Sequence, residues 1–193
     1  MKKNNILPML MPAIVLTSIS VIIAGILAVT NNFTAPVIAK NSEKATNDAL
    51  SVVVPLASEF KIVEKAEEST NENDIYIAYS NDGKEAGYAV SVSPLGFGGN
   101  IDIIVGFSLD KTITGVEIVN SSETPGLGSK ASDKEFKEQF LDKKPPLNVV
   151  KNEKPGENTI SAISGATITS KAVTSGINTA MTELNNYLGG VNG

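Results

Sequence analysis

Apolar residues dominate one long stretch near the start of the chain. Residues 6–29 are almost wholly apolar. About 24 residues at roughly 1.5 Å rise each are enough for a helix to cross a ~30 Å hydrocarbon core. Lys2 and Lys3 precede this stretch, and no further lysine follows until Lys40. Because cytoplasmic flanks carry the excess of positive charge, the pattern predicts a membrane helix whose N-terminus is cytoplasmic.

The alternative for this stretch is a signal peptide that is cleaved after export. The apolar run is longer than the ~7–15 residues that such a peptide needs, and no clear small-x-small cleavage site directly follows it. We therefore expect residues 1–30 to be a retained transmembrane anchor and residues 31–193 to be an extracytoplasmic domain. The protein would then span the cell membrane once.

Beyond the anchor, the pattern first predicts a helix and then strands. Residues 34–54 read as a helix that leaves the membrane, with Thr34 as its cap and Pro36 in its first turn. The charged residues 64–73 predict a loop or the ends of two strands. Alternating or continuous apolar positions then predict four strands, separated in part by turns at residues 81–83 and 109–111. These strands are expected at residues 75–79, 88–92, 101–107 and 113–119.

Helical patterns return in the last third of the chain. Residues 132–135 fit a capping box, and Phe136 and Phe140 follow on one helix face. A final helix is expected to begin near Thr169 or Ser170 and to stop at Gly189. Its apolar positions recur with a period of 3.6 at Val173, Ile177, Ala180, Met181, Leu184 and Leu188. Strands followed by helices predict an α+β fold, a small antiparallel sheet packed with helices after one transmembrane helix.

Composition narrows the chemistry that this domain can perform. The net charge of −5 argues against a nucleic-acid partner, since phosphate binding requires a basic face. The absence of cysteine and histidine excludes thiolate-held metals, disulfides and the usual general base, and we expect no metal site and no catalytic residue. All 16 basic residues are lysine, so no bidentate arginine clamp on a phosphate is possible. Any redox chemistry must therefore come from a bound organic cofactor.

A short polar turn precedes the final predicted helix. It reads Ser164, Gly165, Ala166 and Thr167, which places a threonine hydroxyl beside two very small residues. The free N–H groups and the positive dipole end of the following helix would point at this turn, and that environment favours a phosphate. The alternative is ordinary capping, because Ser, Thr and Gly are common before helices. Taken alone, the turn does not decide between the two.

Two glycine-containing segments lie upstream of this turn. The first, Gly-Phe-Gly-Gly at residues 96–99, follows a strand that contains Gly-Tyr-Ala at residues 87–89. The second, Glu-Thr-Pro-Gly-Leu-Gly at residues 123–128, has one proline that restrains φ and two glycines that permit positive φ. Loops of this kind can present N–H groups to a planar ligand. Each can equally be a plain surface turn or hairpin loop.

In the order and spacing of these motifs, the chain resembles the FMN-binding domain family found in the G subunits of Rnf electron-transport complexes. The related C subunits of sodium-pumping NADH:quinone reductases share the domain. The matching residues are those at 87–89, 96–99, 123–128 and 164–170, together with the anchor and Asn32, Thr34 and Pro36 just beyond it. The resemblance covers essentially the whole chain, and the short chain is closer to the Rnf protein.

The resemblance implies a flavoprotein that carries electrons. FMN is expected to be joined through its phosphate to Thr167 as a phosphoester, which a separate flavin transferase makes. The other expected cofactor-binding residues are Ser164, Gly165, Ala166, Glu123, Thr124, Gly126, Leu127 and Gly128. The partners would be other membrane subunits of an Rnf-type complex that couples electron transfer between ferredoxin and NAD to sodium or proton transport. The chain would not be catalytic alone, but a redox subunit of an ion-translocating oxidoreductase.

Two other classes of protein remain open on the sequence. One is a membrane-anchored regulator or sensor that uses the FMN domain without any link to ion transport. The chain holds no second domain that could give an output signal, which weighs against this class. The other is an anchored binding module whose motifs are only turns and caps.

Overall fold

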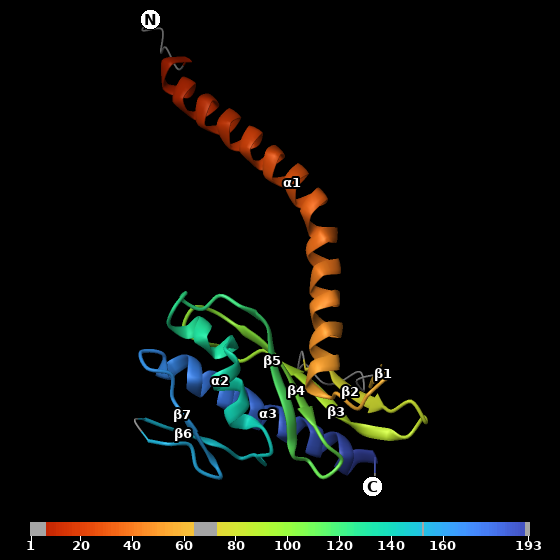
Figure 1. The fold of residues 1–193 in the computed structure, drawn as a ribbon. Helices are drawn as coiled ribbons and strands as arrows, with labels where there is room; N and C mark the ends of the chain where they lie inside the picture. The colour runs from red at the N-terminus through yellow and green to blue at the C-terminus, as the bar shows by residue number, and fades with distance from the viewer. Residues whose placement is uncertain (1–6, 64–72, 152, 192–193) are drawn as a thin grey trace, which may run out of the picture. The chain divides into compact units, whose positions relative to one another are not determined.

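The computed structural model describes residues 7–63, 73–151 and 153–191. The described chain divides into two units, residues 1–44 and residues 45–193. Helix α1 (Leu7–Val53) supplies most of the first unit, and its last residues belong to the second (Figure 1). The predicted start of the apolar helix at Ile6 and most of the predicted loop at residues 64–73 lie outside the described residues.

The prediction of two separate helices before the sheet was wrong, because α1 is continuous. Thr34 was expected to cap a second helix, but it lies inside α1, where its hydroxyl donates back to the Thr30 carbonyl at 3.0 Å. Pro36 is likewise an interior residue of the helix. Threonine can lie inside a helix when its hydroxyl bonds to the carbonyl four residues earlier. The presence of a residue type that often caps helices therefore did not identify a helix start.

The first half of α1 has the character of a membrane span. Within the part of the chain that the structure describes, Leu10–Val53 is the one helix that is long and apolar enough to cross a membrane by length and composition. Large apolar side chains at its start are exposed on all sides, including Leu10, Ile14, Ile22 and Leu27. Exposed apolar surface of this extent is costly in water and favourable in lipid.

Five strands form an antiparallel sheet in the order β1-β2-β3-β4-β5, and the pattern predicted four of these strands and their antiparallel arrangement. Strand β4 pairs with β3 on one side and β5 on the other and is almost wholly buried. The turn predicted at residues 81–83 joins β2 to β3, where Gly83 has φ +75°. The strands are β1 (Glu59–Ile62), β2 (Ile75–Tyr79), β3 (Glu85–Val92), β4 (Ile101–Phe107) and β5 (Ile113–Ser121).

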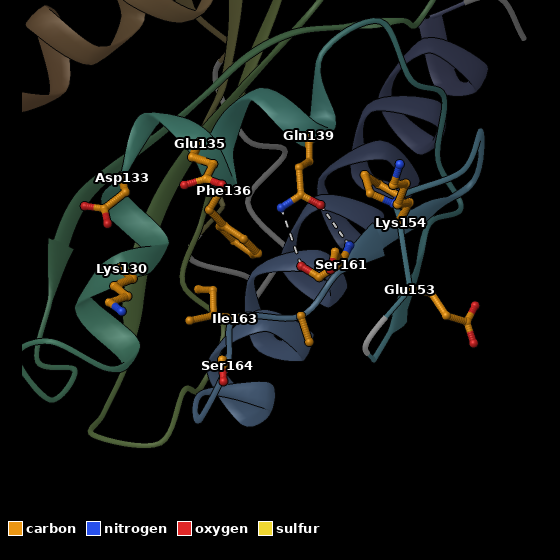
Figure 2. Close-up of a pocket in the computed structure, with 12 residues that line it drawn as sticks. Lys130, Asp133, Glu135, Phe136, Gln139, Glu153, Lys154, Ser161, Ile163 and Ser164 are labelled. Carbon is orange, nitrogen blue, oxygen red and sulfur yellow. Dashed lines mark hydrogen bonds between the residues drawn. The ribbon is translucent and has the colours of Figure 1, made fainter.

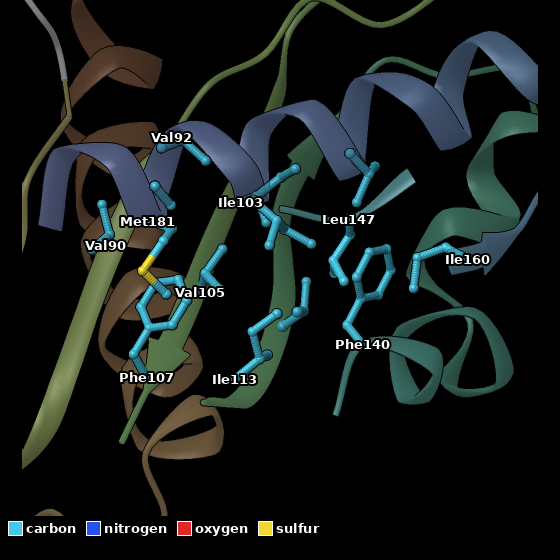
Figure 3. Close-up of a cluster of buried hydrophobic side chains, with 14 of the residues drawn as sticks. Val90, Val92, Ile103, Val105, Phe107, Ile113, Phe140, Leu147, Ile160 and Met181 are labelled. Atoms are coloured by element: carbon cyan, nitrogen blue, oxygen red, sulfur yellow. The ribbon is translucent and has the colours of Figure 1, made fainter. Parts of the chain in front are cut away.

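One face of this sheet is covered by helix α3 (Thr167–Val191). Met181 of α3 lies over Val105 and Phe107 of the sheet in the largest buried cluster (Figure 3). The predicted stripe of apolar α3 residues faces this cluster, with Ile177, Ala180 and Leu184 fully buried. The apolar side chains on one face of the strands and the apolar stripe of the helix therefore pack together in one core. The predicted stop at Gly189 was wrong, since α3 continues to Val191.

The opposite face of the sheet receives the end of helix α1. Leu50 and Val53 pack against Ile104 and small residues of β2 and β3 in a second buried cluster. The hydroxyl of Thr114 on β5 donates to the Val53 carbonyl at 2.6 Å. The last residues of α1 are thus part of the folded domain, and residues 45–54 act as a second layer on the sheet.

Short elements connect β5 to α3. They are η1 (Gly128–Ser132), α2 (Lys134–Lys137), η2 (Glu138–Phe140), β6 (Asn148–Val150) and β7 (Thr159–Ser161), and β6 and β7 pair in parallel. Phe136 and Phe140 share one face as predicted, with an edge-to-face contact at 5.4 Å. The capping box was wrong: Asp133 is the N-cap of α2 and makes no side-chain capping bond. The Phe136 amide, which a capping Asp133 side chain would bind, donates to the Asp133 carbonyl at 3.1 Å instead.

The architecture confirms the predicted α+β class, an N-terminal apolar helix followed by an antiparallel sheet and helices. Strand β1 and the β6–β7 pair were not predicted. Each has only three or four residues, which is too short for an alternating pattern to be recognised. The boundary between anchor and domain at residue 30 stays a prediction.

Candidate functional site

Three connecting segments that are distant in sequence meet at one end of the domain. The glycine loop (residues 96–99) joins β3 to β4, the Pro-Gly loop (residues 123–128) follows β5, and the threonine turn (residues 163–167) leads into α3. Residues of all three line one cleft of about 370 Å³, which we call the threonine cleft. Its lining residues are Phe97, Glu123, Thr124, Leu127, Gly128, Gly165, Ala166, Thr167, Ile168 and Thr169.

The threonine turn is shaped by hydrogen bonds that surround the start of α3. Gly165 has φ +78°, a conformation that side chains rarely adopt, and the Ala166 amide donates to the Ile163 carbonyl at 3.0 Å. The buried hydroxyl of Ser170 accepts the Ile163 amide at 2.9 Å. These contacts begin α3 at Thr167, two or three residues before its predicted start at Thr169 or Ser170. Thr167 therefore lies in the first helical turn.

The first turn of α3 offers donors to a ligand. In the described chain, the backbone amides of Thr167, Ile168 and Thr169 have no hydrogen-bond acceptor. The half-buried hydroxyl of Thr167 has none either among these residues. Such amides sit at the positive end of a 25-residue helix, and this is a favourable place for an anion such as a phosphate.

The glycine loop and the Pro-Gly loop are held by their own backbone bonds. The Gly96 amide donates to the Gly99 carbonyl at 2.8 Å, which closes the glycine loop. In the Pro-Gly loop, the Leu127 amide donates to the Thr124 carbonyl at 3.1 Å, and Gly126 has φ +77°. Both loops are therefore formed turns, as predicted from their glycines.

Glu123 connects these segments from inside. Its side chain is only 7 % exposed although it lines the cleft. One carboxylate oxygen, Oε1, accepts the amides of Phe97 at 2.6 Å and Gly98 at 3.2 Å. The other, Oε2, accepts the hydroxyl of Thr169 at 2.9 Å. One buried carboxylate thus joins the glycine loop, the Pro-Gly loop and α3.

Apolar side chains are exposed around the cleft. Phe97 is 70 % exposed, and Leu127 and Ile168 are also exposed. A cleft lined mostly by apolar groups, with a few placed polar groups, is typical of small-molecule sites. Phe97, Ile168 and Thr169 belonged to the recognised motifs but not to the predicted contact set. The signal that would have found them is an aromatic residue inside a glycine loop and a second threonine two positions after Thr167.

The remaining predicted site residues lie elsewhere. Gly126 is exposed and lines neither this cleft nor its larger neighbour. Ser164 is exposed and lines the neighbouring cleft of about 580 Å³, whose far wall comes from α2 and η2 (Figure 2). In that cleft Gln139 pairs with the Ser161 backbone, accepting the amide at 2.8 Å. The structure therefore brings seven of the nine predicted residues to the threonine cleft.

The larger cleft is lined by charged side chains of both signs. It carries the carboxylates of Asp133, Glu135 and Glu153 against two lysines, Lys130 and Lys154 (Figure 2). By contrast, Glu123 is the one charged residue among the described residues that line the threonine cleft, and three protein donors already engage it. The lining residues of the two clefts have the same formal charge of −1, so the described amides without acceptors at the start of α3 are what favours the smaller cleft for an anionic ligand.

The glycine-tyrosine-alanine segment at residues 87–89 has a different role. A side chain at Gly87 would collide with the Phe107 carbonyl, and Tyr88 is buried in the main core. Burial raises the pKa of Tyr88, and the nearby Glu85 carboxylate raises it further. This segment supports the sheet and does not line the threonine cleft.

The threonine cleft has groups that fit the flavin nucleotide implied by the family resemblance. Unpaired amides and a free hydroxyl occur at one end, and exposed apolar groups suited to a flat ring occur beside them. Thr167 and the first turn of α3 would hold the phosphate, while Phe97, Leu127 and Ile168 would contact the ring.

Comparisons with known proteins define the class first. The family model described as "FMN-binding domain" matches residues 96–182, a range that contains all three segments of the cleft. The model described as "RnfG N-terminal region" matches residues 1–53, which end where α1 ends. The fold agrees with NqrC of Shewanella oneidensis, with a TM-score of 0.52 and 22 % identity over 66 % of each chain.

A second solved structure has the same fold. The C subunit of the Na⁺-translocating NADH-quinone reductase of Parabacteroides distasonis gives a TM-score of 0.57 at 24 % identity, over 74 % of this chain and 89 % of that one.

Curated relatives are more similar. The G subunit of the Na⁺-translocating ferredoxin:NAD⁺ oxidoreductase complex of Acetobacterium woodii is 41 % identical over 86 % of each chain. The G subunit of the proton-translocating ferredoxin:NAD⁺ oxidoreductase complex of Clostridium ljungdahlii is 36 % identical over 90 % of each chain. The chain belongs to the family formed by the G subunits of ion-translocating oxidoreductase complexes.

Proposed function

We propose that this chain is the flavoprotein electron-carrier subunit of a membrane complex that couples electron transfer between ferredoxin and NAD⁺ to ion translocation. The observation that carries the proposal is the assembly of the three motifs around the threonine cleft, within the residues that match the FMN-binding domain. FMN supplies the redox chemistry, and the chain supplies its position and surroundings. The relatives' membership in multi-subunit complexes supports the expectation of partner subunits.

FMN is proposed to be attached covalently through its phosphate to Thr167. In this ester the threonine Oγ1 bonds to the phosphorus of FMN. A separate flavin transferase makes the bond from a flavin dinucleotide donor: the donor's phosphorus–oxygen bond to its nucleoside monophosphate breaks, and that leaving group takes up the proton that Thr167 gives up. The proposal is supported by the half-buried Thr167, which lines the cleft and whose hydroxyl has no partner in the described chain. The neighbouring amides of Ile168 and Thr169 would stabilise the phosphate charge.

The attachment is tested by expression with and without a flavin transferase, followed by a denaturing gel viewed under ultraviolet light. We expect a fluorescent band from the wild-type chain only with the transferase, and no band from Thr167→Ala. Thr182→Ala is the matched control, because it removes an exposed threonine hydroxyl of the same helix that lies outside the cleft. A band that survives Thr167→Ala would contradict the assignment.

The electron-carrier role is tested by gentle purification of the anchored chain from its host. Multi-span membrane subunits should accompany it, and the flavin should be reduced when reduced ferredoxin is added to the purified complex. Recovery of the chain alone would instead favour a regulator or sensor.

The orientation is proposed from the lysines that precede the apolar stretch: a cytoplasmic N-terminus and an FMN domain on the other side. Because the chain has no cysteine, a single cysteine reports one position without background labelling. A membrane-impermeant thiol reagent should label Lys151→Cys in intact cells and Lys3→Cys only after lysis. The reverse labelling pattern would contradict the orientation.

A further inference from the structure

The carboxylate of Glu123 is the point at which the walls of the threonine cleft are joined. It receives two amides of the glycine loop and the hydroxyl of Thr169, which belongs to the first turns of α3. An ionised carboxylate offers about four acceptor positions, so these three donors use most of them. The side chain is therefore largely committed to protein contacts before any ligand arrives.

The surrounding glycines make room for this carboxylate. A Cβ at Gly96 would collide with Oε1, and a Cβ at Gly128 would collide with Oε2. A Cβ at Gly98 would collide with the Ser122 carbonyl, immediately before Glu123. The chain thus uses glycines on both sides of one charged group, and packing as well as hydrogen bonding holds the group in place.

The contacts cross long distances in sequence. The bond to Phe97 joins residues 26 positions apart, and the bond to Thr169 joins residues 46 positions apart. Within the described chain, the amides of Phe97 and Gly98 have Glu123 as their acceptor. Without it, the glycine loop would keep its closing bond from Gly96 to Gly99 but lose its connection to α3.

We propose that Glu123 is a positioning residue that holds the glycine loop against the first turns of α3, so that the threonine cleft is formed before the flavin binds. The inference rests on the proposed function, since it assigns the formed cleft to flavin attachment. It differs from the expectation for Glu123 as a direct flavin contact, because its oxygens engage protein donors. Pre-formed sites bind with a smaller ordering cost, which is the advantage of such a connection.

The first test uses the full-length chain in detergent without flavin. Amide hydrogen exchange at Phe97 and Gly98 is compared between the wild type, Glu123→Ala and Glu123→Gln. We expect exchange at both amides to be about tenfold faster or more in Glu123→Ala, since the loss of a charged acceptor frees them. Amides of the buried strand β4 should stay protected, which shows that the sheet is intact.

Glu123→Gln is the conservative variant that rescues the contacts. The amide oxygen of glutamine can accept the Phe97 and Gly98 amides, while its NH₂ donates to the Thr169 hydroxyl. We expect wild-type protection of both amides in this variant. Unchanged exchange in Glu123→Ala, or exchange in Glu123→Gln as fast as in Glu123→Ala, would overturn the proposal.

The second test measures the initial rate of covalent flavin attachment by the transferase. We expect this rate to fall about tenfold or more in Glu123→Ala and to stay within about twofold of the wild type in Glu123→Gln. Glu117→Gln on β5 is the control, because its carboxylate pairs with Lys137 outside the cleft. Wild-type attachment to Glu123→Ala would overturn the proposal.

Thr169→Val covers the case in which Glu123→Ala does not fold. It keeps the buried carboxylate and its two amide bonds but removes the hydroxyl that joins it to α3. We expect a smaller fall in attachment rate, about threefold, and an unchanged rate would count against the connection. Absence of flavin from the wild-type chain would defeat the proposed function instead, while the exchange experiment, which needs no flavin, would still decide the role of Glu123.

Discussion

At two places in the domain, a pair of glycines leaves space for another group to pack closely. The group is a helix backbone at one place and a carboxylate side chain at the other. On one face of the sheet, Gly106 and its cross-strand partner Gly115 lie against the backbone of Val53 at the end of α1. At the threonine cleft, Gly96 and Gly128 lie against the carboxylate of Glu123. We call the first the Val53 contact and the second the Glu123 contact.

The two contacts respond differently to added atoms. The Val53 contact is backbone against backbone, and the helix can yield only by moving as a whole. The Glu123 contact is backbone against a side chain, which can rotate away at the loss of three hydrogen bonds. The difference teaches that the first contact serves stability, whereas the second serves the shape of the site.

The largest effect is expected at the Val53 contact. In Gly106→Ala the new Cβ would collide with the Val53 carbonyl oxygen, and the neighbouring Thr114 hydroxyl would be crowded as well. We expect a loss of roughly 3 kcal/mol in the free energy of unfolding, because neither backbone can yield cheaply. Denaturant unfolding of the full chain in detergent measures it.

The matched control for Gly106→Ala is Gly156→Ala, where the nearest atom is the end of the Thr159 side chain at 3.1 Å. That change should cost no more than about 0.5 kcal/mol. Equal losses in both variants would show that the contact with Val53 is not what sets the cost.

A smaller loss of stability with a larger loss of function is expected at the Glu123 contact. In Gly128→Ala the Cβ displaces the Glu123 carboxylate, so we expect the free energy of unfolding to fall by about 2 kcal/mol. Covalent flavin attachment should fall more strongly than in Gly106→Ala molecules that remain folded. The gel assay under ultraviolet light, normalised to folded protein, compares the two. A normal attachment rate would contradict the distinction between the contacts.

The hydrogen bond at the Val53 contact is expected to have a moderate effect. Thr114→Val keeps the shape of the side chain and removes the donor to the Val53 carbonyl, a bond of 2.6 Å. We expect about 1 kcal/mol less stability and an unchanged rate of flavin attachment. Unfolding and gel assays on the same preparation check both. A fall in attachment rate would mean that the two contacts are coupled.

The smallest effect is expected at a glycine with no neighbour. Gly189 lies inside α3, and a Cβ there meets no atom within 4 Å. Gly189→Ala should therefore raise the free energy of unfolding by about 0.5 kcal/mol, because alanine favours the helix. A loss of stability would show that Gly189 has a contact which the helix alone does not explain.

Much of the fold was predictable because its main elements are long and regular. The bounds of β2 and β4 were predicted as the structure has them, and the apolar stripe of α3 pointed to its buried face. Short elements such as β1 and the β6–β7 pair were not predicted, because three or four residues are too few to show an alternating hydrophobic pattern. The start of α3 was misplaced, because the contact between Ser170 and Ile163 sets it and local sequence does not reveal that contact.

The candidate site was predictable by residue type but not by role. Seven of the nine predicted residues line one cleft, which local spacing alone did not require. Ser164 and Gly126 lie outside that cleft, because both occur at exposed positions in turns. A Cβ at Gly126 would meet no atom within 4 Å. Glu123 was expected at the flavin. Its commitment to Phe97, Gly98 and Thr169 depends on three segments that only folding brings together.

The sequence by itself determined the apolar span, the main strands of an antiparallel sheet and the threonine at the start of the last helix. These features follow from hydrophobic periodicity and turn chemistry, which act over a few neighbouring residues. Tertiary structure alone decided that helix α1 runs on into the domain to rest on Gly106 and Gly115, and that Glu123 joins the cleft walls. Both depend on close packing between segments that are distant in sequence. At each contact, glycine lacks the side chain that would otherwise prevent the two groups from approaching.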